Sequence, residues 1–313
     1  MSHHPFRLLI LLVLVFLSGT IAAGTSTLTL ITLSGPGSQS DTAARYFSHE
    51  LEQHLGQRVV VVNSPGGEGV VGMRHFINNG VSCDSMMLGN ASVLFAAMHQ
   101  QELGFDAMKQ FVPIHGLAES RSVIVVPTDS PVHNLKELVT LHAKEQRLIG
   151  GSISPATSTS MSMLDESLRV KTDVIRYKTT PQMLLDLVGG RLDYSIVLTG
   201  TSAIQGLIET GKLRVIAGVD PKRHPAFPAI PTIVEQGYAP IEVFYWGAFF
   251  VNDNTPASCQ KRLQAAVRAT LYSATGEKFS KQAGAPQRLL VDGEQMGAIM
   301  RRQLKQIALL NAR

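Results

Sequence analysis

Short apolar runs rich in β-branched residues alternate with amphipathic stretches along most of this 313-residue chain, and this alternation constrains its fold most strongly. The apolar runs predict strands at 28–33, 59–62, 86–88, 122–126, 148–150, 173–177, 194–198, 213–219 and 246–251. The amphipathic stretches predict helices at 41–55, 135–143, 160–168, 181–188, 259–272 and 293–310. This order favours an α/β fold with mostly parallel sheets. Because no repeat or long polar linker interrupts it, we expect two α/β lobes joined by strands that cross between them.

The first 23 residues have the pattern of a signal peptide. Arg7 precedes an unbroken apolar run at 8–17, and the small residues Ala22 and Ala23 follow. The run is roughly half the ~20 residues that a membrane-spanning helix needs. We therefore expect cleavage after Ala22 or Ala23 and export of the remaining chain. Because no cysteine lies near that junction, we expect no lipid anchor.

Length, charge and motif content bound the class of protein. The remaining ~290 residues suffice for two domains of ordinary size. The formal net charge is +4, and the densest basic group, Arg301, Arg302 and Lys305, is typical of a solvated helix face. We expect no nucleic-acid partner. No zinc-type spacing, nucleophile elbow or phosphate loop occurs, although a hydrolase whose catalytic triad converges only in three dimensions remains an alternative.

The two cysteines leave one question open. Cys83 and Cys259 can form a disulfide in an oxidising compartment, but nothing in their spacing requires one. At this point the sequence does not decide whether they pair.

Two loops rich in glycine and serine follow predicted strands and lead into predicted helices, at 34–41 and 150–160. Backbone N–H groups at a helix start can face an anion, where the helix dipole favours negative charge. We expect Asp41 or Ser40 to cap the first of these helices. Ligands of open α/β sheets bind outside the carboxyl ends of the strands, so the two loops predict facing walls of a cleft.

A third glycine-rich segment, 67–72, matches the G-x-G-x-x-G string of dinucleotide-binding folds. That fingerprint needs glycine directly after the strand, whereas residues 63–66 intervene here. No acidic residue stands about 20 positions further on to bind a ribose hydroxyl. We interpret the segment, with Glu68 in it, as a structural loop.

In their order, these motifs resemble the extracytoplasmic receptors of tripartite tricarboxylate transporters, the Bug receptor family. The similar segments lie at 35–45, 55–69, 177–178, 186–193, 211–214, 222–223, 230–232, 235–237, 246–247 and 255–256. Several departures from the family pattern leave the ligand undetermined. Ser38 replaces the second loop glycine, Thr179 replaces the glycine after Tyr-Lys, and Ser160 lies about where the second lobe often carries histidine. Residues 197–199 stand where many members have an acid or an amide.

The resemblance implies a type II periplasmic-binding-protein fold, with two α/β lobes, a hinge and an interlobe ligand cleft. We place lobe 1 at 24–121 and 219–313 and lobe 2 at 122–218, after a signal peptide at 1–23. The implied protein is a monomeric periplasmic receptor, not an enzyme, that captures a small carboxylate and delivers it to membrane transporter subunits. No cofactor or metal is implied. A periplasmic ligand sensor for signalling is the alternative.

The resemblance also implies how the carboxylate is held: by backbone N–H groups, hydroxyls and ordered water, without an arginine clamp. Ser38 and Thr159 are expected on opposite walls of the cleft. The expected ligand-binding residues are Gly37, Ser38, Gln39, Ser40, Asn90, Ser92, Ser154, Thr157, Ser158, Thr159, Thr199 and Thr201.

Overall fold

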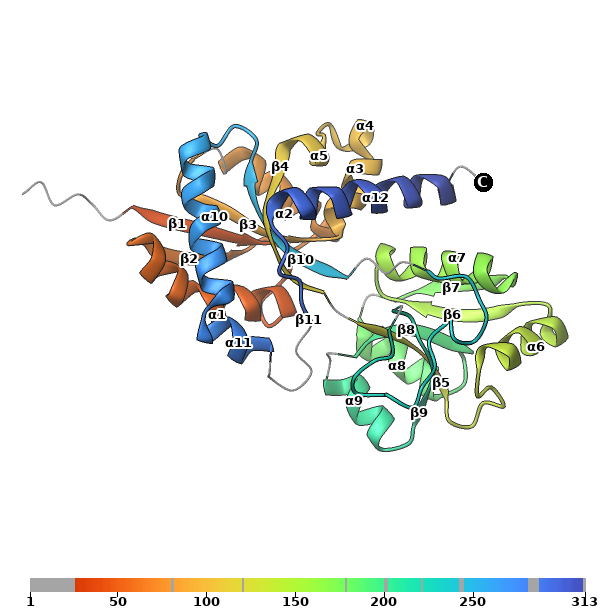
Figure 1. Ribbon diagram of the computed structural model, residues 1–313. Coiled ribbons are helices and arrows are strands. Elements are labelled where there is room, and N and C mark those ends of the chain that lie inside the picture. The colour runs from red at the N-terminus through yellow and green to blue at the C-terminus, as the bar shows by residue number, and fades with distance from the viewer. Residues whose placement is uncertain are drawn as a thin grey trace, which may run out of the picture.

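The computed structural model describes residues 26–79, 82–119, 121–177, 179–199, 202–220, 222–241, 245–280 and 287–311. Within these ranges the chain forms two α/β lobes, each built on its own sheet (Figure 1). The predicted signal peptide at 1–23 lies outside the described residues.

The larger lobe contains a six-stranded sheet in the order β11-β4-β10-β3-β1-β2. Its strands are β1 (Thr27–Thr32), β2 (Arg58–Asn63), β3 (Ser85–Asn90), β4 (Phe111–Glu119), β10 (Trp246–Asn252) and β11 (Gln287–Arg288). The strands β1, β2 and β3 are parallel, whereas β10 lies antiparallel between β3 and β4. A strand from late in the chain therefore occupies the middle of a sheet that the early part of the chain begins.

Helices cover both faces of this sheet. They are α1 (Gln39–Leu55), the 3-10 turn η1 (Gly67–Gly69), α2 (Val70–Asn79), α3 (Ser92–Met98), α4 (Gln100–Leu103), α5 (Ala107–Gln110), α10 (Ala257–Tyr272), α11 (Ala274–Ser280) and α12 (Gly293–Asn311). One apolar core joins α1, α10 and α11 to the sheet, with Phe47 and Phe279 among its buried members. A second core joins α2, α3 and α12 to the opposite face, with Phe76 and Met300 buried in it.

The smaller lobe comes from one continuous segment. Its five-stranded sheet has the order β7-β6-β8-β5-β9. The strands are β5 (Ser122–Pro127), β6 (Leu148–Ser152), β7 (Thr172–Arg176), β8 (Tyr194–Leu198) and β9 (Leu213–Gly218), and the helices are α6 (Leu135–Glu145), α7 (Pro155–Leu168), α8 (Thr180–Val188) and α9 (Ser202–Glu209). In this sheet β6, β7 and β8 are parallel, and β5 is antiparallel to β8 and β9.

The chain crosses between the lobes at the end of β4, since Glu119 pairs with β10 in one sheet and Ser122 pairs with β8 in the other. On the return side, Val219 and Ile241 pack in the core of the smaller lobe. The segment after β9 therefore stays with that lobe. We propose a second crossing between Ile241 and the start of β10, in place of the predicted boundary at 219.

Every predicted strand is present within two residues of its expected bounds, and β4 and β11 are additional. The pattern of β4 is interrupted by Pro113 and Gly116, which are poor strand formers. The prediction that residues 155–159 form a loop is wrong, because α7 begins at Pro155. Ser154 caps this helix, and proline suits the first helical position because its φ is already fixed near the helical value.

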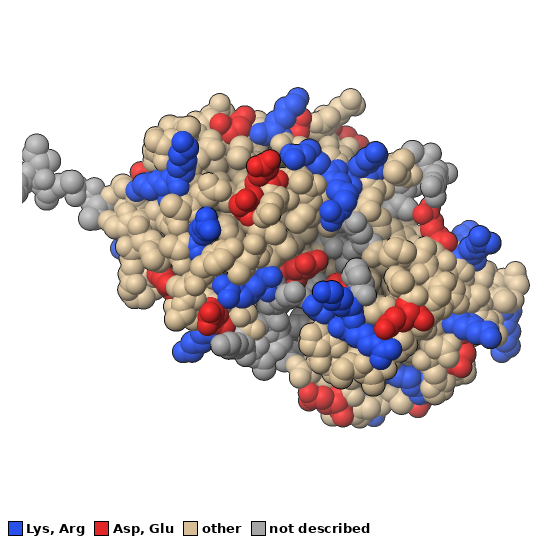
Figure 2. Space-filling view, viewed as in Figure 1, with Lys and Arg blue, Asp and Glu red and all other residues tan. Residues whose placement is uncertain are grey.

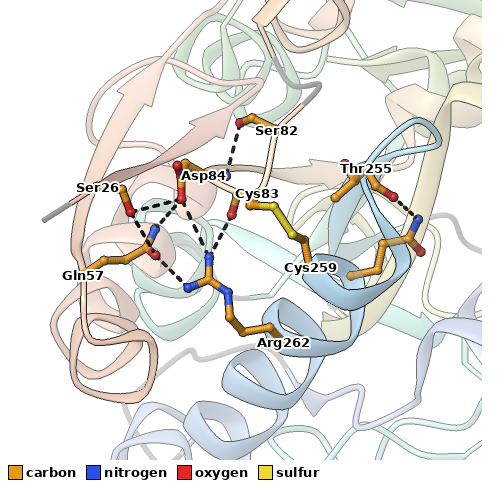
Figure 3. Close-up of a disulfide and its surroundings, with 9 residues drawn as sticks. Ser26, Gln57, Ser82, Cys83, Asp84, Thr255, Cys259 and Arg262 are labelled. Atoms are coloured by element: carbon orange, nitrogen blue, oxygen red, sulfur yellow. Dashed lines mark hydrogen bonds and ion pairs between the residues drawn. A yellow bond between two sulfur atoms is a disulfide. The ribbon is translucent and has the colours of Figure 1, made fainter. Parts of the chain in front are cut away.

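Cys83 and Cys259 form a disulfide that joins the loop just before β3 to the start of α10 (Figure 3). Their Cα atoms are 5.2 Å apart. The Arg262 guanidinium, on the same helix, donates hydrogen bonds to the Cys83 carbonyl at 3.1 Å and to Gln57 Oε1 at 2.9 Å. It also lies 3.7 Å from the Asp84 carboxylate. The pairing that the sequence left open is thus present, and polar contacts join the same two elements.

Charged side chains are interspersed over the surface rather than gathered by sign. Figure 2 shows acidic and basic residues mixed on one face of the molecule. Arg301, Arg302 and Lys305 are exposed on α12, as the sequence predicted. None of the helices in the described ranges has the length and apolar content to span a bilayer.

Candidate functional site

A cavity of about 370 Å³ lies between the lobes, which both contribute to its lining. The polar and charged members of the lining are Ser34, Ser38, Gln39, Ser40, Glu68, Asn90, Ser92 and Ser154. The apolar and aromatic members are Ala43, Leu88, Ala91, Phe95, Leu117, Ala118, Ile153, Pro155, Ala156, Leu198, Tyr245, Trp246 and Phe279. Such a cavity suits a small molecule with a polar end and an apolar body.

The larger lobe contributes the start of α1 to the cavity. Ser38 is the N-cap of this helix, and its Oγ accepts a hydrogen bond from the Asp41 N–H at 3.2 Å. The prediction of Asp41 or Ser40 as the cap is therefore wrong. Gln39 and Ser40 occupy the first helical positions, where backbone N–H groups have no partner within the helix. These N–H groups can donate hydrogen bonds to an anion at the edge of the cavity.

Asp41 holds the loop before α1 in place from inside the lobe. Its buried carboxylate accepts hydrogen bonds, each 2.9 Å long, from the Gly37 N–H, Asn63 Nδ2 and Arg45 Nε. These donors, the Gly37 N–H most strongly, lower the pKa of Asp41, although burial acts in the opposite direction. The ionised carboxylate therefore fixes the backbone of residues 37–40 beside the cavity.

The smaller lobe contributes the start of α7. Ser154 is its N-cap, and its Oγ accepts a hydrogen bond from the Thr157 N–H at 3.2 Å. The Thr157 Oγ1 lies 2.5 Å from the hydroxyl of Tyr245, the residue before β10. Burial raises the pKa of Tyr245 to about 12, so its hydroxyl keeps its proton at neutral pH. This contact joins the segment that returns to the larger lobe to the helix that borders the cavity.

The structure brings about half of the predicted ligand residues to one place. Those that line the cavity are Ser38, Gln39, Ser40, Asn90, Ser92 and Ser154. Gly37 lies in the same loop, but its N–H is bonded to Asp41. Thr157 borders the cavity indirectly, through the Tyr245 hydroxyl.

The remaining predicted residues lie elsewhere. Ser158 and Thr159 line a neighbouring groove, because they belong to the first turns of α7 rather than to a loop. Thr159 therefore does not share the cavity that Ser38 lines. Thr199 Oγ1 lies 2.7 Å from His224 Nε2 and does not line the cavity. Thr201 is outside the described residues.

Sequence reasoning missed several lining residues. Glu68, which the sequence places in a structural loop, lines the cavity as well. An acidic residue among glycines was the available signal. Tyr245 and Trp246 come from the return crossing, and Phe279 comes from α11. No local pattern connects these distant segments with the two glycine-serine loops.

The lining has neither lysine nor arginine among its described members, so any anion here meets neutral dipoles rather than a fixed cation. Over the same ranges of the chain, no group of three or more His, Cys, Asp or Glu side chains could hold a metal ion.

Two α/β lobes, joined by crossing segments and lining one cavity from both sides, define a solute-binding protein of the type II periplasmic fold. Residues 43–306 match the family described as tripartite tricarboxylate transporter family receptor. The chain belongs to this family, and the family predicted from the order of the sequence motifs is confirmed.

Known proteins show the same relationship. A UPF0065 protein in the tcbD-tcbE intergenic region of Pseudomonas sp. (strain P51) is 27% identical over 257 residues, which is 80% of this chain and 75% of that protein. The periplasmic binding protein BugD superposes with a TM-score of 0.74 at 26% identity, covering 91% of this chain and 96% of BugD. The R. palustris protein Rpa4515, solved with adipate, gives a TM-score of 0.76 at 22% identity, and the match covers 91% of this chain and 95% of Rpa4515. The predicted two-lobed fold is thus confirmed.

Proposed function

We propose that this chain is a periplasmic receptor that binds a small carboxylate between its lobes and delivers it to the membrane subunits of a tripartite transporter. The observation that carries this proposal is the interlobe cavity, whose lining includes the starts of both α1 and α7. A carboxylate there would interact with oriented N–H dipoles and hydroxyls. The adipate in the R. palustris neighbour supports this ligand class, and the predicted signal peptide supports the compartment.

Closure of the lobes would couple ligand binding to delivery. A ligand that contacts both walls stabilises a closed arrangement by the difference between its affinities for the closed and open forms. The chain passes from one lobe to the other between Glu119 and Ser122 and returns between Ile241 and Trp246. Transporter subunits would then recognise the closed form. The alternative is that a signalling protein recognises it.

The proposal assigns no enzyme activity to the chain. Ser64 Oγ lies 2.6 Å from His75 Nδ1, a distance suited to an activated nucleophile. Neither residue lines the interlobe cavity, so this pair does not favour a hydrolase that uses the same cleft.

A carboxylate that fits the cavity is expected to stabilise the protein and to close it. At a hundredfold excess over its dissociation constant, binding to the native state alone raises the free energy of unfolding by about 2.7 kcal/mol. That gain corresponds to several degrees in the thermal midpoint, at ~2–4 °C per kcal/mol. A melting screen of mono- and dicarboxylates, followed by small-angle scattering with the best ligand, measures both effects. Neutral sugars that stabilise the protein where all acids fail would contradict the proposal.

Ser38→Asp is expected to weaken carboxylate binding at least tenfold, about 1.4 kcal/mol, because it adds a negative charge beside the anion. Aspartate is as good an N-cap as serine, so α1 should keep its start. Calorimetric titration with the best acid from the screen measures the loss. Asn134→Asp is the matched control, since Asn134 caps α6 and does not line the cavity. Equal affinities for the two variants would place the carboxylate elsewhere.

A further inference from the structure

Glu68 is the only charged side chain among the described residues that line the interlobe cavity. It also lines the neighbouring groove, so this exposed residue lies between the two spaces. In the described part of the chain, no hydrogen bond or ion pair engages this carboxylate. A negative charge beside a proposed anion site is unfavourable if the ligand carries negative charge alone.

Glu68 has an unusual backbone conformation for a residue that is not glycine. Its φ and ψ are 55° and 31°, in the left-handed region that glycine adopts most easily. The neighbouring Gly67 and Gly69 also have positive φ, at 52° and 99°. Non-glycine residues held in this region concentrate at functional sites. The chain thus carries a glutamate at a position where glycine would be the less strained residue.

The two observations together limit the chemistry of the ligand. A second carboxylate directed at Glu68 would be repelled, because like charges disfavour each other. An ammonium group would instead gain a charge-assisted hydrogen bond. The remaining lining is mostly apolar and offers no other charge of either sign among its described members.

We propose that Glu68 selects a zwitterionic ligand, with its carboxylate at the start of α1 and its ammonium group at the Glu68 carboxylate. The inference rests on the proposed function, since it takes the carboxylate site from there. Glu68 is then the residue that distinguishes amino acids, or related amino carboxylates, from acids of the same carbon skeleton without the amino group.

Arg176 is an alternative partner for Glu68, in place of a ligand ammonium group. It lines the neighbouring groove from the smaller lobe, so closure could bring it to Glu68 as an ion pair between the lobes. In that case Glu68 would affect every ligand equally, whatever charges the ligand carries. Ligand selection and lobe closure therefore predict different patterns for paired ligands.

The test compares acids that differ only in the amino group, with the mature protein and its Glu68→Gln, Glu68→Lys and Arg176→Gln variants. The pairs are leucine with 4-methylpentanoate, phenylalanine with 3-phenylpropanoate, and glutamate with glutarate, titrated by calorimetry. We expect the amino member of the best pair to bind the unaltered protein at least tenfold more tightly. Glu68→Gln should remove this preference and leave the deaminated acid within threefold, and Glu68→Lys should reverse it. Arg176→Gln should behave as the unaltered protein does.

Three outcomes would overturn the inference. The first is a deaminated acid that binds as tightly as its amino partner in every pair. The second is an equal loss for both members in Glu68→Gln, and the third is an Arg176→Gln variant that reproduces the Glu68→Gln result. Failure of all acids, with and without the amino group, would instead contradict the carboxylate receptor itself. Thermal midpoints without ligand show that each variant is folded.

Discussion

Reduction of the Cys83–Cys259 disulfide is expected to lower the free energy of unfolding by about 5 kcal/mol. The bond joins residues 176 positions apart, and the entropy that it removes from the unfolded chain grows with the logarithm of the closed loop. At ~2–4 °C per kcal/mol, the thermal midpoint should fall by about 10 °C or more. Melting curves with and without a thiol reductant measure the effect.

The matched control is the double variant Cys83→Ser with Cys259→Ser, whose midpoint should be low and indifferent to the reductant. Ligand affinity should not change, because neither cysteine lines the cavity and Arg262 still bonds Gln57 and the carbonyl of residue 83. An unchanged midpoint for the unaltered protein in reductant would show that the unfolded chain is already constrained in another way.

Asp41→Ala is expected to weaken both the fold and ligand binding. The change removes the acceptor for the Gly37 N–H, the Asn63 amide and the Arg45 guanidinium, and hydrogen bonds to a charged group each contribute ~1.5–3 kcal/mol. We expect the free energy of unfolding to fall by about 3 kcal/mol. Carboxylate affinity should fall more than tenfold, because the backbone of residues 37–40 is no longer fixed. Denaturant melts and calorimetric titration measure the two losses.

The charge of Asp41 gives this prediction a pH dependence. Its pKa is lowered in the folded protein, first by the Gly37 N–H and then by Asn63 and Arg45. The stability that it contributes is present above its unfolded pKa of ~3.9 and is lost as the pH falls through the lower folded value. The stability gap between the unaltered protein and Asp41→Asn should therefore be constant above about pH 5 and narrow below about pH 4. A constant gap down to pH 2 would mean that the charge is not what holds the loop.

The fold could be predicted from the sequence because its signals are local. Apolar runs such as 148–150 and 194–198 mark strands whatever lies beyond them, and the order of the motifs indicated the family. The prediction failed where a residue acts against its own propensity. Pro113 and Gly116 lie inside β4 because β10 pairs with this strand along its length.

The site was less predictable because its chemistry depends on contacts between distant segments. The Thr157–Tyr245 hydrogen bond joins residues 88 positions apart. Likewise, the pairing of Cys83 with Cys259 requires the start of α10 to lie beside the residues before β3, which no spacing rule reveals. Ser154 followed by Pro155 was a readable helix start, and recognising it would have placed Thr159 on α7 rather than in the loop.

The position of β10 has a consequence for how the chain folds as it is synthesised. The strands of the smaller lobe follow one another between Ser122 and Gly218, so that lobe has its whole sheet before β10 appears. In the larger lobe β3 and β4 do not pair with each other, because β10 lies between them and pairs with both. Unpaired strand edges invite association with other chains. The lobe that begins first is therefore completed last, and until then the edges of β3 and β4 that pair with β10 lack their partner.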